Sequence, residues 1–92
     1  MEWKHVEALA GKTLQTTTER PFVVERVTPT TVYLLVGPRK RRETISRANL
    51  EKAAELLRAG KKLGGPSDYR LKVADERPAC AWAILHELSL VG

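Results

Sequence analysis

The side chains that most often perform chemistry are few in this chain and poorly spaced for catalysis or metal binding. Thiol and imidazole groups are limited to Cys80, His5 and His86, too few for a structural zinc site. Cys80 and His86 are six residues apart on an expected helix, about 120° apart around its axis, so they should not form a nucleophile–base pair. We therefore expect no metal and no cofactor, and we favour a protein that is not an enzyme.

Two glycine-containing segments resemble parts of phosphate-binding loops. Residues 11–13 read GKT, but the glycine that such a loop needs five positions earlier is replaced by Val6, so we expect a helix end followed by a strand. Residues 64–67 read GGPS, lie close to Lys61 and Lys62, and precede an expected helix. Backbone amides of such a turn can hold an anion, although most such turns only connect helices.

Positive charge is concentrated in the middle of the chain. The net charge of the 92 residues is +5, but residues 39–72 alone contain eleven cations and four anions, while residues 1–38 are neutral and residues 73–92 are acidic. A local excess of this kind predicts an electropositive surface if the fold keeps these residues together.

The densest cluster is the segment GPRKRRE at residues 37–43. Gly37 and Pro38 favour a tight reversal with Arg39 and Lys40 at its tip, and the next two arginines enter a strand on opposite faces. The cations repel one another, and solubility or protection of a sheet edge would explain them. A polyanion would turn that repulsion into attraction by releasing counterions, and the arginine fork suits phosphate. The predicted nucleic-acid contacts are Arg39, Lys40, Arg41, Arg42, Arg47, Lys61, Lys62 and Arg70.

The elements that must position these residues follow from hydrophobic periodicity and turn residues. A short helix is expected over residues 2–10, then β-strands over 13–18, 22–27 and 31–36, and a polar fourth strand over 41–45. Strand 31–36 is apolar on both faces, which predicts packing on both sides. Three helices follow, over 47–59 after a Ser46 cap, near 68–74 after Ser67, and from 78 to about 89. In the second of these, Tyr69 or Leu71 should face inward with Val73.

This order predicts one α+β domain, in which a meander of three or four antiparallel strands is covered by three C-terminal helices. The single cysteine and the lack of an apolar N-terminal or membrane-spanning segment predict a cytoplasmic protein that is not in the membrane. Few amide side chains and one methionine fit a thermophilic source, and chance drift in a short chain explains them equally well.

The primary functional hypothesis is a non-catalytic module that binds the backbone of DNA or RNA. One alternative is a protein-interaction or self-associating domain, which would form a homodimer or bind a protein partner through the alanine-rich last helix around Trp82 or through an edge strand. A second alternative is a metal-independent ribonuclease that uses arginines and His86. The last two helices have the layout of a helix-turn-helix, but the last helix offers few polar groups to read bases.

Overall fold

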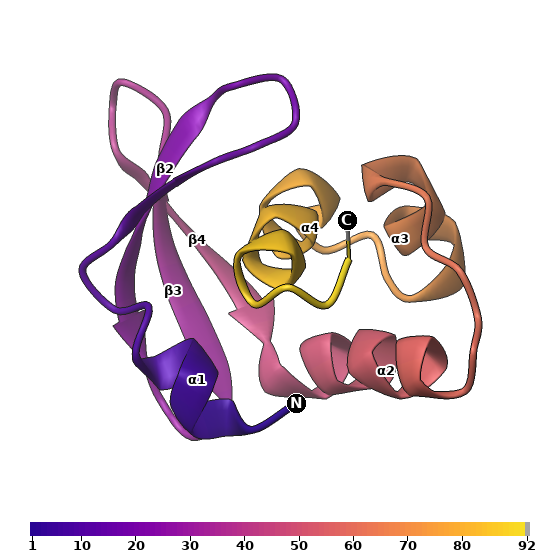
Figure 1. The fold of residues 1–92 in the computed structure, drawn as a ribbon. Coiled ribbons are helices and arrows are strands. Elements are labelled where there is room, and N and C mark those ends of the chain that lie inside the picture. Colours follow the sequence, from indigo (N-terminus) through magenta and orange to yellow (C-terminus); the bar gives the residue numbers. More distant parts are fainter. Residues whose placement is uncertain (92) are drawn as a thin grey trace.

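The computed structural model describes residues 1–91 and has the α+β architecture that the sequence predicts (Figure 1). A short helix precedes a four-stranded sheet, and three helices follow. The elements are α1 (Trp3–Glu7), β1 (Thr13–Gln15), β2 (Pro21–Val27), β3 (Thr31–Val36), β4 (Arg41–Ser46), α2 (Arg47–Arg58), α3 (Pro66–Lys72) and α4 (Pro78–Glu87).

The sheet is an antiparallel meander in the order β1-β2-β3-β4, in which each strand pairs with its sequence neighbours. A bulge between Val24 and Arg26 interrupts the β2–β3 register. Glu25 and Arg26 both reach the sheet face that bears Tyr33, since Arg26 lies 4.3 Å from the Tyr33 ring centroid and Glu25 pairs with Arg42. The bulge therefore places two adjacent charged residues on one face, which regular alternation would not allow.

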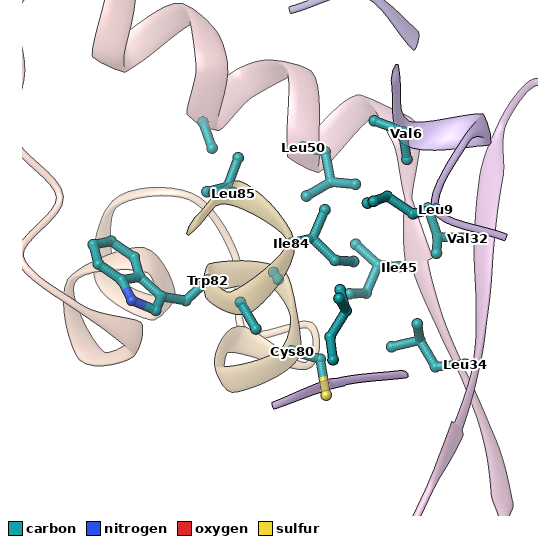
Figure 2. Close-up of a cluster of buried hydrophobic side chains, with 14 of the residues drawn as sticks. Val6, Leu9, Val32, Leu34, Ile45, Leu50, Cys80, Trp82, Ile84 and Leu85 are labelled. Atoms are coloured by element: carbon teal, nitrogen blue, oxygen red, sulfur yellow. The ribbon is translucent and has the colours of Figure 1, made fainter. Parts of the chain in front are cut away.

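The core lies between the other face of the sheet and the helices. Alternate strand residues are buried, among them Val32, Leu34 and Ile45, and they meet Leu50 of α2 and Ile84 of α4 (Figure 2). Residues 80–85 of α4 are all buried, because this helix is surrounded by the rest of the chain. Helix α2 instead buries one face, as its alternation of apolar and charged residues predicts.

Several element bounds differ from those predicted. Helix α1 ends at Glu7, and β1 ends at Gln15 because the Thr16 hydroxyl accepts a hydrogen bond from the Arg20 amide and so holds a turn. Helix α4 ends at Glu87, two residues earlier than predicted.

Helix α3 also differs from its prediction at its start. It begins at Pro66 with Gly65 as its N-cap, so Ser67 lies inside the first turn and does not cap it. Tyr69 and Val73 are one helical turn apart and are buried, whereas Leu71 lies on the opposite face with 77% of its surface exposed.

The prediction that β3 is covered on both sides is wrong. Val32 and Leu34 are fully buried, but Tyr33 and Leu35 on the opposite face are only half-buried. Figure 1 shows α2, α3 and α4 on one side of the sheet. The apolar residues of the outer face are shielded in part by charged neighbours, such as Arg26 over Tyr33 and Arg42 beside Leu35 in the adjacent strand.

Glu76 fixes the connection between α3 and α4 onto the beginning of α2. Its Oε1 atom accepts hydrogen bonds from the Ser46 amide at 2.9 Å, from the Ser46 hydroxyl at 3.2 Å and from Asn49 Nδ2 at 2.8 Å. The Ser46 hydroxyl also accepts from the Asn49 amide, as predicted for the N-cap of this helix. A carboxylate near a helix N-terminus is further favoured by the helix dipole.

Tyr69 is fully buried, and among residues 1–91 its hydroxyl has no hydrogen-bond partner. Burial, and to a lesser degree the nearby Glu76 carboxylate, raise the pKa of this hydroxyl. Because an unpaired buried hydroxyl is destabilising, we expect Tyr69→Phe to increase the free energy of unfolding by about 1 kcal/mol in urea titrations. Tyr33→Phe on the outer face should change it by less than about 0.5 kcal/mol. A clear loss of stability in Tyr69→Phe would show that the hydroxyl makes a stabilising hydrogen bond.

Candidate nucleic-acid interface

A cleft of about 1020 Å³ lies at the end of the sheet, between two hairpin turns and the beginning of α4. Figure 1 shows the turn between β1 and β2 and the turn between β3 and β4 at this same end. The cleft is lined by residues of the first turn, by the strand ends next to both turns, by Gly37 and Pro38, and by residues 77–80. Three segments that are distant in the sequence thus form one concave surface.

Three arginines line this cleft, one from each segment. Arg20 ends the first turn, Arg41 begins β4, and Arg77 precedes α4. Arg20 and Arg41 form no salt bridge within the described residues, and Arg77 is only loosely paired, with 3.6 Å between its Nη1 and Glu43 Oε1. No Asp or Glu from residues 1–91 is among the lining residues. The cleft can therefore offer guanidinium groups to an anion.

The β3–β4 turn follows from its sequence. Gly37 has a φ of +80°, which glycine adopts without strain, and Pro38 stands at the second position of the turn that the Lys40 amide closes by donating to the Gly37 carbonyl. Arg41 is paired with Val36. It therefore lies on the core-facing side of the sheet, where it reaches the cleft.

Arg77 is held in place by its neighbours. It is the N-cap of α4 and adopts a left-handed conformation with a φ of 45°, which is uncommon for a residue other than glycine. The preceding residue, Glu76, is bound to Ser46 and Asn49, and the following residue, Pro78, begins the helix. The positive end of this helix lies beside the cleft, and no side chain of residues 1–91 caps it.

The predicted contacts of the hairpin separate into two groups. Arg39 and Lys40 are exposed at the tip, and Arg41 lines the cleft. Arg42 faces the opposite side of the sheet, as alternation predicts, where its Nε and Nη2 donate to the two carboxylate oxygens of Glu25 at 3.0 and 3.1 Å. The charge of Arg42 is therefore already paired with that of Glu25 on the outer face of the sheet.

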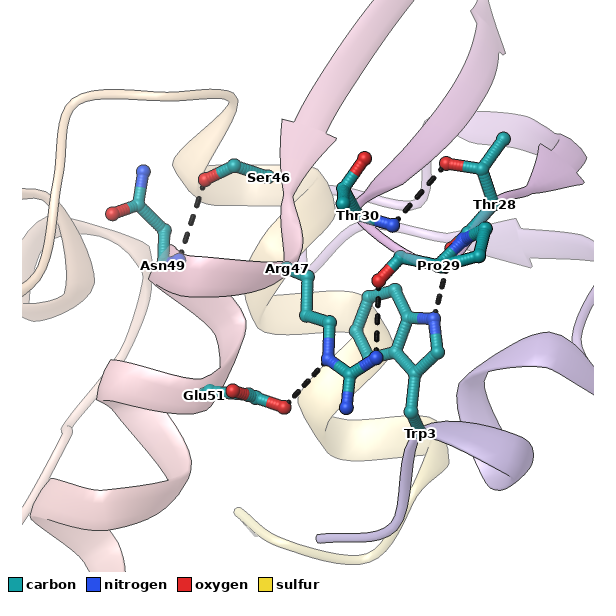
Figure 3. Close-up of polar contacts among 8 residues, drawn as sticks. All are labelled: Trp3, Thr28, Pro29, Thr30, Ser46, Arg47, Asn49 and Glu51. Carbon is teal, nitrogen blue, oxygen red and sulfur yellow. Dashed lines mark hydrogen bonds and ion pairs between the residues drawn. The ribbon is translucent and has the colours of Figure 1, made fainter.

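Arg47 is engaged within the protein. Its guanidinium lies over Trp3, 4.9 Å from the ring centroid, and donates to Glu51 at 2.7 Å and to the Pro29 carbonyl at 3.0 Å (Figure 3). The unfavourable position of this cation in the first turn of a helix is thus explained by contacts within the chain.

The second cluster of cations lies elsewhere. Lys61 and Lys62 follow α2, and Arg70 is exposed on α3. In Figure 1 the segment between α2 and α3 and the β3–β4 turn lie on opposite sides of the molecule. The fold does not unite the two clusters into one surface.

The glycine turn at residues 64–67 already holds an anion from its own chain. The Gly64 amide donates to Asp68 Oδ2 at 2.8 Å, and this hydrogen bond, with Lys72, lowers the pKa of Asp68. A carboxylate from the first turn of α3 therefore already accepts a hydrogen bond from a backbone amide of this turn.

Sequence reasoning missed Arg20 and Arg77. Each is a single cation beside an acidic residue in the chain, Glu19 and Glu76 respectively, so neither contributes to a local charge excess. The only signal was their position next to Pro21 and Pro78, which marked them as turn residues. Their approach to Arg41 depends on how the sheet and α4 pack.

The groups that a nuclease would need are not gathered at the cleft. His86 lies near the other end of α4, about 12 Å along the helix axis from Pro78, and His5 is on α1. Cys80 lines the cleft, but burial raises its pKa to about 11 even though Arg77 opposes the rise, so the thiol is protonated at neutral pH.

No group of three or more His, Cys, Asp or Glu side chains is arranged to hold a metal ion within residues 1–91. In the same part of the chain, no helix combines the length and the apolar character required to cross a bilayer.

Comparison of this chain with known protein families, with curated proteins and with solved structures found no match.

Proposed function

We propose that this domain is a non-catalytic module that binds the phosphate backbone of nucleic acid at the cleft end of the sheet. The observation that supports it best is the set of cations there without a carboxylate partner among residues 1–91, namely Arg20, Arg39, Lys40 and Arg41. Arg77 adds a loosely paired guanidinium. Arginine forks match phosphate geometry, and release of counterions favours the complex.

Arg42, Arg47, Lys61, Lys62 and Arg70 are not part of this proposed surface. The first two are paired within the protein. Lys61 and Lys62 belong to the segment between α2 and α3, Arg70 is on α3, and none of the three lines the cleft. The expectation of a cytoplasmic protein, based on its single cysteine, is compatible with this proposal.

The competing functions have less structural support. Self-association through the alanine-rich helix would need its apolar residues at the surface, but Cys80 to Leu85 are buried in the core of the same chain. A ribonuclease would need an acid and a base at the bound phosphate, and His86 does not line the cleft.

A salt titration of binding tests the proposal. Binding of duplex DNA and of single-stranded RNA is measured by fluorescence anisotropy over about 50 to 200 mM salt. If about three phosphates are contacted, the logarithm of affinity should fall against the logarithm of salt concentration with a slope of about −2 to −3. Replacing Arg39, Lys40 and Arg41 with alanine should lower affinity by at least about tenfold and make the slope shallower.

The matched control replaces Lys61, Lys62 and Arg70 with alanine. It removes the same net charge from residues that do not line the cleft, and we expect a change in affinity of less than about threefold. Equal losses in the two triple variants would mean that net charge alone attracts the nucleic acid, and the proposal would be wrong.

A further inference from the structure

We infer that the cleft accepts an unpaired nucleotide, so that the domain prefers single-stranded nucleic acid to a duplex. This inference rests on the proposed function and names the form of nucleic acid that fits the same site. The cleft would bind the phosphate with Arg20, Arg41 and Arg77, and the base would lie against its apolar walls.

The composition of the walls supports an unpaired base. Between the arginines, the cleft is lined by apolar groups of Pro21, Val36, Pro38 and Ala79. Phosphate and sugar groups gain nothing from contact with an apolar surface, whereas the face of an unstacked base is stabilised by packing against one. Proteins that bind single strands combine a positively charged groove with side chains against which the bases pack. These side chains are usually aromatic, whereas the four wall residues named here are aliphatic.

The shape of the site supports the same inference. A volume of about 1020 Å³ is at the upper end of the range for sites that enclose small ligands, roughly 300 to 1,000 Å³. One nucleotide can enter a cleft of this size. The bases of a duplex are stacked inside it and offer only their edges in the grooves, so a duplex would meet Arg39 and Lys40 at the turn tip and leave the apolar walls empty.

The position of the cations separates the two modes of binding. Arg39 and Lys40 are exposed at the tip of the turn, while Arg41 and Arg77 line the cleft. A duplex held at the tip would depend on the first pair. A nucleotide inside the cleft would depend on the second pair and on free space beside α4.

The experiment measures affinities for a fluorescent single strand of about 12 nucleotides and for a duplex of the same length at one salt concentration. The native chain should bind the single strand at least about tenfold more tightly. The double variant Arg41→Ala with Arg77→Ala should reduce single-strand affinity by at least about tenfold. The control variant Lys61→Ala with Lys62→Ala removes equal charge elsewhere, and it should reduce this affinity by less than about threefold.

A variant without a change of charge tests the space itself. Ala79→Leu adds bulk to the cleft wall. It should lower the affinity for the single strand by about tenfold and the affinity for the duplex by less than about twofold. Ala48→Leu, at an exposed position of α2, is the matched control and should change neither affinity. Circular dichroism and thermal unfolding of each variant confirm that the fold is retained.

The outcomes distinguish this inference from the function on which it rests. One result would overturn the inference and leave backbone binding intact. In that result the chain binds both forms with equal affinity, and the affinity depends on Arg39 and Lys40. It is also insensitive to Ala79→Leu and to the loss of Arg41 and Arg77. Absence of binding to either form would overturn both.

Discussion

Replacing Trp3 with alanine is expected to lower the free energy of unfolding by about 3 to 5 kcal/mol, the largest single effect predicted for this domain. Trp3 is 7% exposed and belongs to the core cluster. Its Nε1 donates to the Thr28 carbonyl at 2.9 Å, and its ring supports the Arg47 guanidinium. The substitution would remove packing, a hydrogen bond and a cation–π contact together.

The reason for the large effect is the length of α1. A helix of five residues is not stable alone, so α1 depends on its contacts with the sheet and with α2. Urea unfolding followed by far-UV circular dichroism measures the loss. Trp3→Phe keeps most of the packing but removes the indole N–H, and its cost should be smaller, about 1 to 2 kcal/mol. A loss below about 1 kcal/mol for Trp3→Ala would show that α1 contributes little to the core.

The second large effect is expected at Glu76. One of its carboxylate oxygens accepts three hydrogen bonds from Ser46 and Asn49, and these bonds fix the α3–α4 connection to the first turn of α2. Glu76→Ala would leave the Ser46 amide and the Asn49 side chain without this acceptor. We expect a loss of about 2 to 3 kcal/mol in the free energy of unfolding, because hydrogen bonds to charged groups are among the strongest.

A conservative variant and a control variant test whether the loss comes from the hydrogen bonds of Glu76. Glu76→Gln keeps an acceptor oxygen but removes the charge, and it should cost about half as much. Glu87→Ala, at the exposed end of α4, removes a carboxylate without hydrogen bonds among the described residues and should change stability by less than about 0.5 kcal/mol. Similar losses for Glu76→Ala and Glu87→Ala in the same urea titrations would contradict the role assigned to the Glu76 network.

Local residue patterns were sufficient for the order of elements. The threonine- and valine-rich runs and the prolines between them predicted the meander, and Gly37 with Pro38 predicted the reversal before β4. The stripe of Leu50 and Ala53 predicted the buried face of α2, and Ser46 its cap. These predictions succeeded because strand pairing between sequence neighbours and helix capping depend on residues that are close together in the chain.

The pairing of individual charges could not be obtained in this way. Arg42 and Glu25 are 17 residues apart and meet only because β2 and β4 flank β3 and both side chains lie on the outer face of the sheet. Arg47 similarly donates a hydrogen bond to the carbonyl of Pro29, which is 18 residues away in the chain. A run of cations therefore predicted a charged turn correctly but did not show which of its charges are free.

The sequence by itself determined the α+β class, the order of the elements and the basic tip of the β3–β4 turn, because these depend on short-range periodicity and turn chemistry. Only the tertiary structure decided that the sheet is covered on one face, that Lys61 and Lys62 lie away from the hairpin, and that Arg20, Arg41 and Arg77 share a cleft. The physical reason is that each of these features depends on how the sheet and helices pack, which brings together residues distant in the chain.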